Sequence, residues 1–287
     1  MQSKKLIFNS DDFGYSKEFN EGIKRGYQSG VLTSTCILAN GDAFDEAINE
    51  VLPEIENIGL GVHLNIIEGK SLTNPALLCD TNGCFNNGFA ELMLKSKNKE
   101  FVDQVELEFR NQIEKVLSKV PIDHINSHVH THAIPELFRL VCKLAKEYEI
   151  KTVRTQFEAP YIVPKINKNL STKFPVNLLK LGLLNSFSIG NRLYAKKEGL
   201  KTNDYILGVT YTGYMDEDTI LYGLKSIINN DCTAEILIHP TYFANANNSK
   251  PFNYKEYLIT QSETIKEEIE KMGWILTNYK PNPNFSY

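Results

Sequence analysis

The chain has 287 residues, of which 42% are hydrophobic and 23% are charged, and its formal net charge at pH 7 is −4. This composition is typical of a globular protein with a sizeable core, and the acidic balance argues against a nucleic-acid surface, which needs a basic excess. The longest apolar runs are too short to cross a bilayer, so we expect no contact with a membrane.

The start of the chain and its cysteines bear on the cellular compartment. Residues 1–5 carry charge but lack the apolar stretch of a signal peptide. The five cysteines are scattered without a Cys-x-x-Cys pair, which is typical of reduced thiols. Cys79 and Cys84 share a Gly/Asn-rich loop, but a zinc clip there lacks two further ligands nearby in the sequence. We therefore expect a cytoplasmic protein.

Strand and helix patterns alternate along the chain. Short apolar or β-branched runs predict strands at 6–9, 33–38, 60–66, 122–126, 152–154, 206–211, 234–239 and 274–276. Residue spacing predicts helices at 17–28, 44–52, 101–120, 135–148 and 254–272. Repeated strand–helix units predict an α/β fold with a parallel sheet. We expect one domain over 1–287, with segments 68–88 and 156–203 as long excursions over the mouth of a barrel.

All six histidines fall in three short segments beside predicted strands, namely 61–65, 124–132 and 236–240. An Asp–Asp pair, Asp11 and Asp12, closes the first strand. In β/α barrels the loops at the carboxyl ends of the strands build the site. Because histidine is both a metal ligand and a proton carrier near neutral pH, this distribution predicts one metal and proton-transfer site.

The Asp11–Asp12 pair has two interpretations. Adjacent residues on a regular strand face opposite ways, so both carboxylates can enter one site only if the alternation breaks before Gly14. One carboxylate would then bind a metal while the other takes a proton. The alternative is a helix N-cap, a common position for aspartate.

The segment 124–132 carries the strongest local signal. Its even positions are His124, Asn126, His128, His130 and His132. If the segment were extended, these side chains would line one face about 6.6 Å apart. An ion with ligand distances of about 2.1 Å could then use at most two of them, and the others would support the ligands or contact substrate. The alternative is a solvated histidine-rich strand that binds metal nonspecifically.

The remaining candidates are isolated residues near strand ends. His63 shares a strand face with Asn65, which could orient it, and His239 is well placed as a general acid. Both could instead be satisfied core histidines. Arg154 could pair with Asp11, hold a substrate oxygen bidentately or form a surface ion pair. Aromatic residues that could stack on sugar faces, or simply pack, are Tyr15, Tyr211, Tyr214, Tyr242 and Phe243.

Four segments together resemble the YdjC/ChbG family of carbohydrate deacetylases. They are Asn9-Ser10-Asp11-Asp12-Phe13-Gly14, Gly61-Val62-His63-Leu64-Asn65, Asn126-Ser127-His128-Val129-His130-Thr131-His132, and Ile236-Leu237-Ile238-His239-Pro240. The resemblance extends over nearly the whole chain. It implies a deformed β/α (TIM-like) barrel of the glycoside hydrolase/deacetylase type.

The resemblance also implies roles for individual residues. Asp12, His63 and His128 would hold one divalent metal ion, Asp11 would be the general base and His239 the general acid. Arg154, His130 and His132 remain candidate substrate contacts. Asn126 stands where the family often has an aspartate, so it would orient a ligand histidine more weakly. The family implies Mg, whereas the ligand types also suit Zn, Co, Ni or Mn.

These observations predict a metal-dependent hydrolase that removes an N-acetyl group from an amino sugar or short oligosaccharide, with a homodimer as a candidate assembly. One alternative is an amidohydrolase or phosphoesterase on the same barrel. Such enzymes usually carry His-x-His on the first strand, whereas here Asp–Asp comes first. The other alternative is a sugar-binding protein without catalytic activity.

Overall fold

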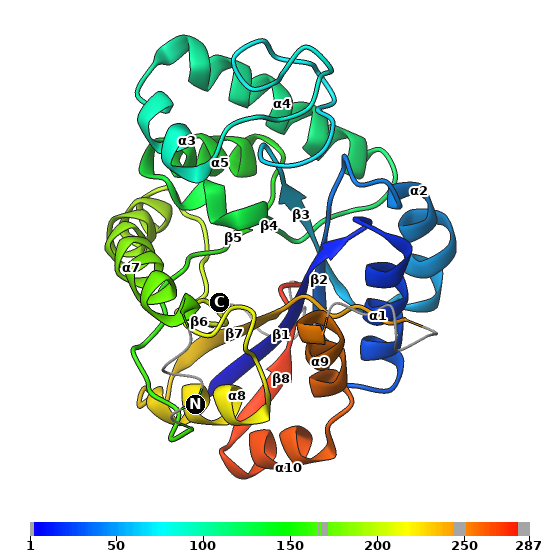
Figure 1. Ribbon diagram of the computed structural model, residues 1–287, viewed down its shortest axis with the longest axis vertical. Helices are drawn as coiled ribbons and strands as arrows, with labels where there is room; N and C mark the ends of the chain where they lie inside the picture. The colour runs from blue at the N-terminus through cyan, green and yellow to red at the C-terminus, as the bar shows by residue number, and fades with distance from the viewer. Residues whose placement is uncertain (1–2, 166, 168–171, 244–250, 281–287) are drawn as a thin grey trace.

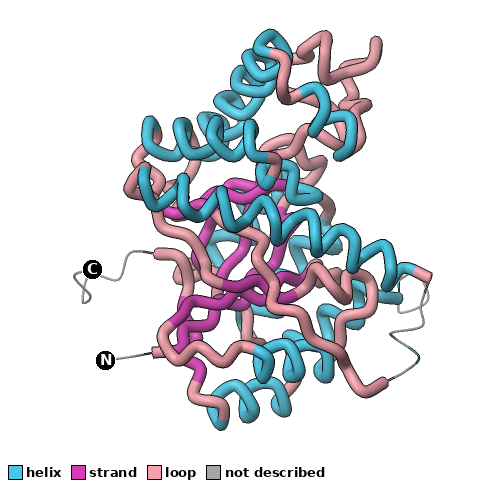
Figure 2. The backbone as a smooth tube through the Cα atoms, turned by 90° about the vertical axis from the view of Figure 1, so that its left-hand side faces the viewer, coloured by secondary structure: helices cyan, strands magenta, loops and turns pink. Residues whose placement is uncertain are grey.

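The computed structural model describes residues 3–165, 167, 172–243 and 251–280. Its strands form one parallel sheet in the order β5-β4-β3-β2-β1-β7-β6, with β8 paired to β1. Their bounds are β1 Lys4–Phe13, β2 Ser34–Ile37, β3 Gly59–Leu64, β4 His124–Ser127, β5 Thr152–Val153, β6 Tyr205–Leu207, β7 Cys232–Ile238 and β8 Trp274–Thr277. Helices surround the curled sheet (Figures 1 and 2), which confirms the predicted deformed β/α barrel.

The deformation lies between β5 and β6. No ladder joins these two strands in the described part of the chain. The side chain of Asn203 bridges the gap instead, because its Oδ1 accepts from the Thr155 amide (2.7 Å) and its Nδ2 donates to the Thr155 carbonyl (2.9 Å). The Ile206 amide also donates to the Phe157 carbonyl (2.8 Å). Loop contacts therefore close the barrel where strand pairing does not.

The helices predicted in the first half of the chain are present, although α3 (Phe89–Lys95) there was not predicted, and the second half differs more. The bounds of the helical segments are α1 Lys17–Gln28, α2 Phe44–Glu46, η1 Ala47–Val51, η2 Leu52–Glu54, α3 Phe89–Lys95, α4 Lys99–Leu117, η3 His128–Ala133, α5 Pro135–Glu147, α7 Lys173–Lys197, α8 Glu217–Ser226, α9 Pro251–Thr260 and α10 Glu263–Lys271. The single helix predicted over 254–272 is wrong, because Ser262 caps a new helix by accepting from the Ile265 amide (3.2 Å).

The two predicted excursions differ in structure. Segment 68–88 bonds to α4, where Glu108 accepts from the Leu72 and Thr73 amides (both 3.0 Å). Segment 156–203 contains the long helix α7, which was not predicted. Its apolar residues lie on several sides, and Leu179 and Leu193 remain 78% and 68% exposed. The helix therefore lacks the single apolar stripe that reveals most helices in a sequence.

Strand alternation separates an apolar outer layer from a polar barrel interior. On β7, Ile236 and Ile238 pack outward in a core shared with α8 and α10, while Glu235 faces inward and is fully buried. On β3, Val62 packs outward while His63 faces inward. The inside of the barrel thus holds polar side chains for a site, beside a small apolar cluster that includes Ile206 and Leu237. None of the described helices is both long enough and apolar enough to cross a membrane.

Candidate active site

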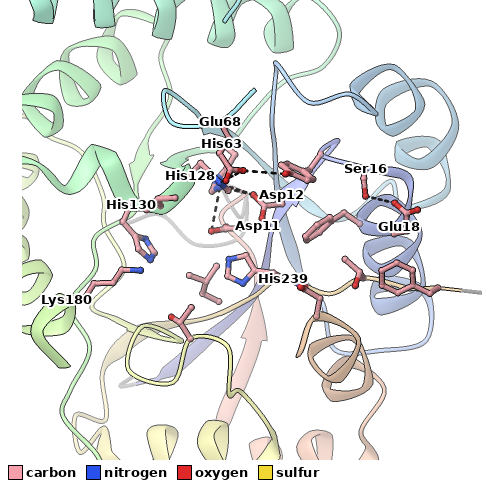
Figure 3. Close-up of a pocket in the computed structure, with 18 residues that line it drawn as sticks. Asp11, Asp12, Ser16, Glu18, His63, Glu68, His128, His130, Lys180 and His239 are labelled. Carbon is pink, nitrogen blue, oxygen red and sulfur yellow. Dashed lines mark hydrogen bonds and ion pairs between the residues drawn. The ribbon is translucent and has the colours of Figure 1, made fainter. Parts of the chain in front are cut away.

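A cavity of about 580 Å³ opens at the carboxyl ends of the strands. It collects residues from the last positions of β1 and β3 and from just after β4 and β7, far apart in the sequence (Figure 3). Predicted site residues in its lining are Asp11, Asp12, His63, His128, His130 and His239. The expected gathering of the acidic pair and the three histidine segments is therefore present in the fold.

The Asp–Asp pair enters the cavity because the strand alternation breaks at Asp12. Its φ is +68°, in the left-handed region that aspartate adopts more readily than most residues. The register of β1 against β2 shifts between Ser10 and Phe13, at the same place. Both carboxylates consequently line the cavity. The N-cap alternative is wrong, since the N-cap of α1 is Ser16.

Asp12, His63 and His128 form a three-residue cluster whose ligand atoms all lie within 4.8 Å of one another. Oδ1 of Asp12 lies 3.0 Å from Nδ1 of His128 and 3.4 Å from Nε2 of His63. Burial raises the pKa of Asp12, but hydrogen bonds from the two histidines outweigh it and hold that pKa well below its usual range. An ionised carboxylate facing two imidazoles is a donor set that suits a divalent metal.

Asn126 fixes the orientation of His63. Its Nδ2 donates to Oδ1 of Asp11 (3.3 Å), and its Oδ1 lies 2.6 Å from Nδ1 of His63. Because a carboxylate can only accept, the amide oxygen must face His63, and Nδ1 of that ring carries the proton. Nε2 lies on the side of Asp12, where it donates to the carboxylate when the ring is protonated and offers its lone pair to a metal when the ring is neutral. An amide at this position can therefore orient a ligand histidine, the role inferred for the family's aspartate.

A second cluster combines Asp11, Cys36 and His63, whose ligand atoms also lie within 4.8 Å of one another. Sγ of Cys36 lies 3.0 Å from Oδ1 of Asp11 and 3.2 Å from Nδ1 of His63. Burial raises the pKa of the Cys36 thiol well above its usual range, so the thiolate form is disfavoured. Asp11 is moreover held by Arg154, and Nδ1 of His63 is held by Asn126. The first cluster is the better metal site.

Arg154 pairs with Asp11 beneath the cavity instead of lining it. Its Nη1 and Nη2 donate to Oδ2 and Oδ1 of Asp11 at 2.8 and 2.7 Å. Burial raises the pKa of Asp11, but the charge and hydrogen bonds of Arg154, aided by His63, bring it well below its usual value. Among described residues, Oδ2 accepts only from Arg154, and it lies 3.9 Å from Nε2 of His63. This oxygen retains acceptor capacity on the side of His63.

His239 faces the cavity from the opposite wall, at the end of β7 (Figure 3). Its Nδ1 lies 3.4 Å from Oε2 of Glu256, which also accepts from the His239 amide at 2.6 Å. Burial lowers the pKa of His239, but Glu256 outweighs this effect and raises the pKa to about 9. Glu256 belongs to α9, and no feature of the sequence linked it to the site.

The histidines after β4 separate into different environments. The chain leaves the strand after Ser127 and enters η3, where Val129 and His130 have left-handed φ values of 52° and 59°. The five even positions therefore do not share one extended face. His130 lines the cavity. His132 is buried outside it, and its Nδ1 lies 2.5 Å from Oγ of Ser127.

Several polar residues of the cavity were not identified from the sequence, and Glu68 and Lys180 are two of them. Oε2 of Glu68 lies 3.5 Å from Nε2 of His128, so this carboxylate is a further neighbour of the Asp12–His63–His128 cluster. Lys180 extends from α7 toward the cavity on the side of His130 (Figure 3). Burial lowers the pKa of this lysine. The negative charge of Glu158 offsets part of this effect.

Comparisons with known proteins agree with the resemblance seen in the motifs. A carbohydrate deacetylase of Clostridium beijerinckii is 30% identical over 93% of this chain and 94% of its own. One of Thermoanaerobacter pseudethanolicus is 27% identical over 96% and 98%. A crystal structure from Enterococcus faecalis, described as a cellobiose-phosphate cleavage protein, superposes with a TM-score of 0.74 at 26% identity, over 96% and 98% of the two chains. The family model described as YdjC-like protein matches residues 5–271, and the chain belongs to this family.

Proposed function

We propose that the protein is a metal-dependent hydrolase that removes an N-acetyl group from an amino sugar or short oligosaccharide. The observation that carries this proposal is the position of the Asp12–His63–His128 cluster, which lies in one cavity with Asp11 and His239. The relatives named carbohydrate deacetylases over nearly the full chain support the same reaction.

The metal would be held by one carboxylate oxygen of Asp12 and one nitrogen each of His63 and His128. A divalent ion there would polarise the acetyl carbonyl as a Lewis acid. Three protein ligands leave coordination positions open, as a catalytic site requires. The mixed oxygen and nitrogen donors are compatible with Mg, which the family resemblance implies, and with Zn, Co, Ni or Mn.

Asp11 acts as the general base in this proposal. Its Oδ2, which keeps one acceptor position toward His63, takes a proton from the attacking water. Arg154 donates one hydrogen bond to each oxygen of the Asp11 carboxylate, so the position of the base is fixed before substrate binds. Arg154 is accordingly a positioning residue, and its complete burial argues against the predicted contact with substrate.

His239 acts as the general acid. Cleavage of the amide bond requires a proton on the departing amine nitrogen, and the raised pKa keeps His239 protonated at neutral pH. The ring is on the cavity wall and 27% of its side chain remains exposed, so substrate can reach it. Asp11 and His239 thus have opposite protonation states, as a base and an acid must have before the reaction.

The cavity lining suggests how a sugar is held. Tyr15, Phe19 and Phe243 supply aromatic surface for the apolar face of a sugar ring. Lys180 and His130 lie at another part of the wall, where an ammonium group would favour a substrate with an anionic substituent. We therefore include sugar phosphates among the candidate substrates, alongside neutral amino sugars.

The test is acetate release from N-acetylglucosamine, di-N-acetylchitobiose and their phosphates, with and without a chelator. We expect release that stops with chelator and returns when Mg, Zn, Co, Ni or Mn is added back. Sugar binding without acetate release would favour the non-enzymatic alternative. Phosphate release instead of acetate release would favour the phosphoesterase. No chelator-sensitive release from any substrate would contradict the proposal.

A further inference from the structure

Three charged side chains and one tyrosine form a continuous line of contacts through the barrel interior below the cavity. It begins at Asp11, continues through Arg154 to Glu235, and ends at Tyr279. The guanidinium of Arg154 lies between the two carboxylates: Nη1 and Nη2 reach Asp11, while Nε reaches Oε2 of Glu235 at 3.1 Å and Nη2 also contacts Oε1. Arg154 and Glu235 are fully buried, and Asp11 is 2% exposed.

Tyr279 ends this line at the opposite end of the barrel from the cavity. It follows β8, and its hydroxyl donates to Oε2 of Glu235 at 2.5 Å. Its ring stacks on His124, with centroids 4.2 Å apart. The position of the ring is therefore fixed by packing, and the position of the hydroxyl is fixed by its hydrogen bond.

The geometry gives each member a defined effect on the next. Nε and Nη2 of Arg154 are held by Glu235, which sets the plane of the guanidinium. That plane determines where the bidentate pair holds the carboxylate of Asp11. Tyr279 in turn fixes the oxygen of Glu235 that accepts from Nε. Asp11, Arg154 and Glu235 are buried, so bulk water does not readily replace a lost partner among them, whereas the bond from Tyr279 is part-buried.

The charges of these three residues also link Glu235 to Asp11. With Glu235 present, the single positive charge of Arg154 is shared between two carboxylates, so its full attraction is not concentrated on Asp11. Without Glu235, the guanidinium would be balanced by Asp11 alone and free to turn toward it. Oδ2 of Asp11, which takes the proton from water in the proposed reaction, would then be a weaker acceptor or would lie in a different position.

We propose that Glu235 and Tyr279 are positioning residues for Asp11, acting through Arg154 from the closed end of the barrel. This inference rests on the proposed function, in which Asp11 is the base. It assigns a role in turnover to a residue after the last strand, on the side of the barrel that substrate does not enter.

The kinetic test compares Tyr279→Phe with the matched control Tyr148→Phe, which removes a hydroxyl that donates to Glu114 (2.5 Å) on the surface. Supporting residues around metal sites typically contribute about 10- to 100-fold to activity. We expect Tyr279→Phe to lower kcat about tenfold and Glu235→Gln about 100-fold, with KM and metal affinity unchanged. The control should retain the wild-type kcat.

Phe at position 279 keeps the ring on His124, so it separates packing from hydrogen bonding. A wild-type kcat in Tyr279→Phe, with a loss only in Tyr279→Ala, would show a packing role and overturn the inference. A change in the KM of Tyr279→Phe with an unchanged kcat would also overturn the inference. If the wild-type protein itself releases no acetate, the proposed function has failed, and a second measurement then decides whether the residues are linked.

That measurement is a double-variant cycle on unfolding by urea, which does not depend on turnover. If the line of contacts is coupled, the shift in midpoint of Tyr279→Phe combined with Asp11→Asn will differ from the sum of the single shifts. Additive shifts would contradict the linkage between the two ends. Tyr148→Phe combined with Asp11→Asn serves as the control and should be additive.

Discussion

The two ends of the barrel use the same residue types for different purposes. At the carboxyl ends of the strands, His63 and His128 face Asp12 in an open cavity. At the other end, His124 also has an aspartate partner, with its Nδ1 2.6 Å from Oδ1 of Asp123, yet its ring is completely buried. The comparison teaches that a histidine–carboxylate pair identifies a site only where the fold leaves room for a ligand.

The glycine at position 61 shows how the closed end is filled. A Cβ atom there would lie 2.4 Å from Nε2 of His124, so the ring occupies the space that a side chain would need. At the open end, the space beside His63 and His128 is cavity. The predictions below ask whether this difference is also a difference in function.

The largest effect is expected from His128→Ala. It removes one of three proposed ligands, and we expect the metal and all chelator-sensitive activity to be lost. Metal content after dialysis, measured by elemental analysis, tests this directly, with His124→Gln as the variant from the closed end that should keep its metal. Full occupancy in His128→Ala would instead point to His130, the other histidine of this segment that lines the cavity, as the ligand.

Asp11→Asn should lose turnover but keep the metal, because Asp11 is a proposed base and not a ligand. General bases contribute about 100- to 10,000-fold, so we expect a loss of kcat within that range. Metal content and acetate release are measured on the same preparation. A variant that lost both together would show that Asp11 supports the metal site as well.

The pH dependence of activity should depend on Glu256. His239 must be protonated to act as an acid, so activity should fall as the pH rises through its pKa of about 9. Removing the neighbouring negative charge lowers the pKa of an imidazolium by about 1–3 units. Glu256→Gln should therefore move the alkaline limb of kcat/KM to lower pH. An unchanged alkaline limb would argue against His239 as the acid.

The smallest effect is expected from Lys180→Met, which removes a charge from the cavity wall without altering the metal cluster. A hydrogen bond to a charged group contributes about 1.5–3 kcal/mol, so KM for a phosphorylated substrate should rise about tenfold or more. KM for the neutral sugar should change little. Equal effects on both substrates would indicate a steric or structural role for Lys180.

The sequence predicts residues better than it predicts their partners. Strand-end positions and motif order identified Asp11, Asp12, His63, His128 and His239, all of which line the cavity. Glu256 contacts His239 from α9, and Lys180 reaches the cavity from α7. Neither could be found in this way, because no motif or strand end marks them. Tertiary packing alone brings these helices to the barrel.

Local backbone conformation is the second reason why parts of the site could not be predicted from the sequence. Periodicity predicts regular strands and helices, but it does not register single residues in the left-handed region, such as Val129 and His130. Those two residues end the extended run after β4 and send His130 and His132 to different environments. The roles of these histidines consequently depended on a turn that alternation could not reveal.

The left-handed backbone at position 12 also limits how the site can be redesigned. Most side chains cost about 1–2 kcal/mol in this conformation, whereas asparagine, aspartate and histidine adopt it more readily. Histidine is among the tolerated residues and is itself a metal ligand. Asp12→His would convert the cluster to three imidazoles, the donor set of several zinc enzymes. A single substitution that the backbone accepts would thus shift the metal preference of the scaffold toward zinc.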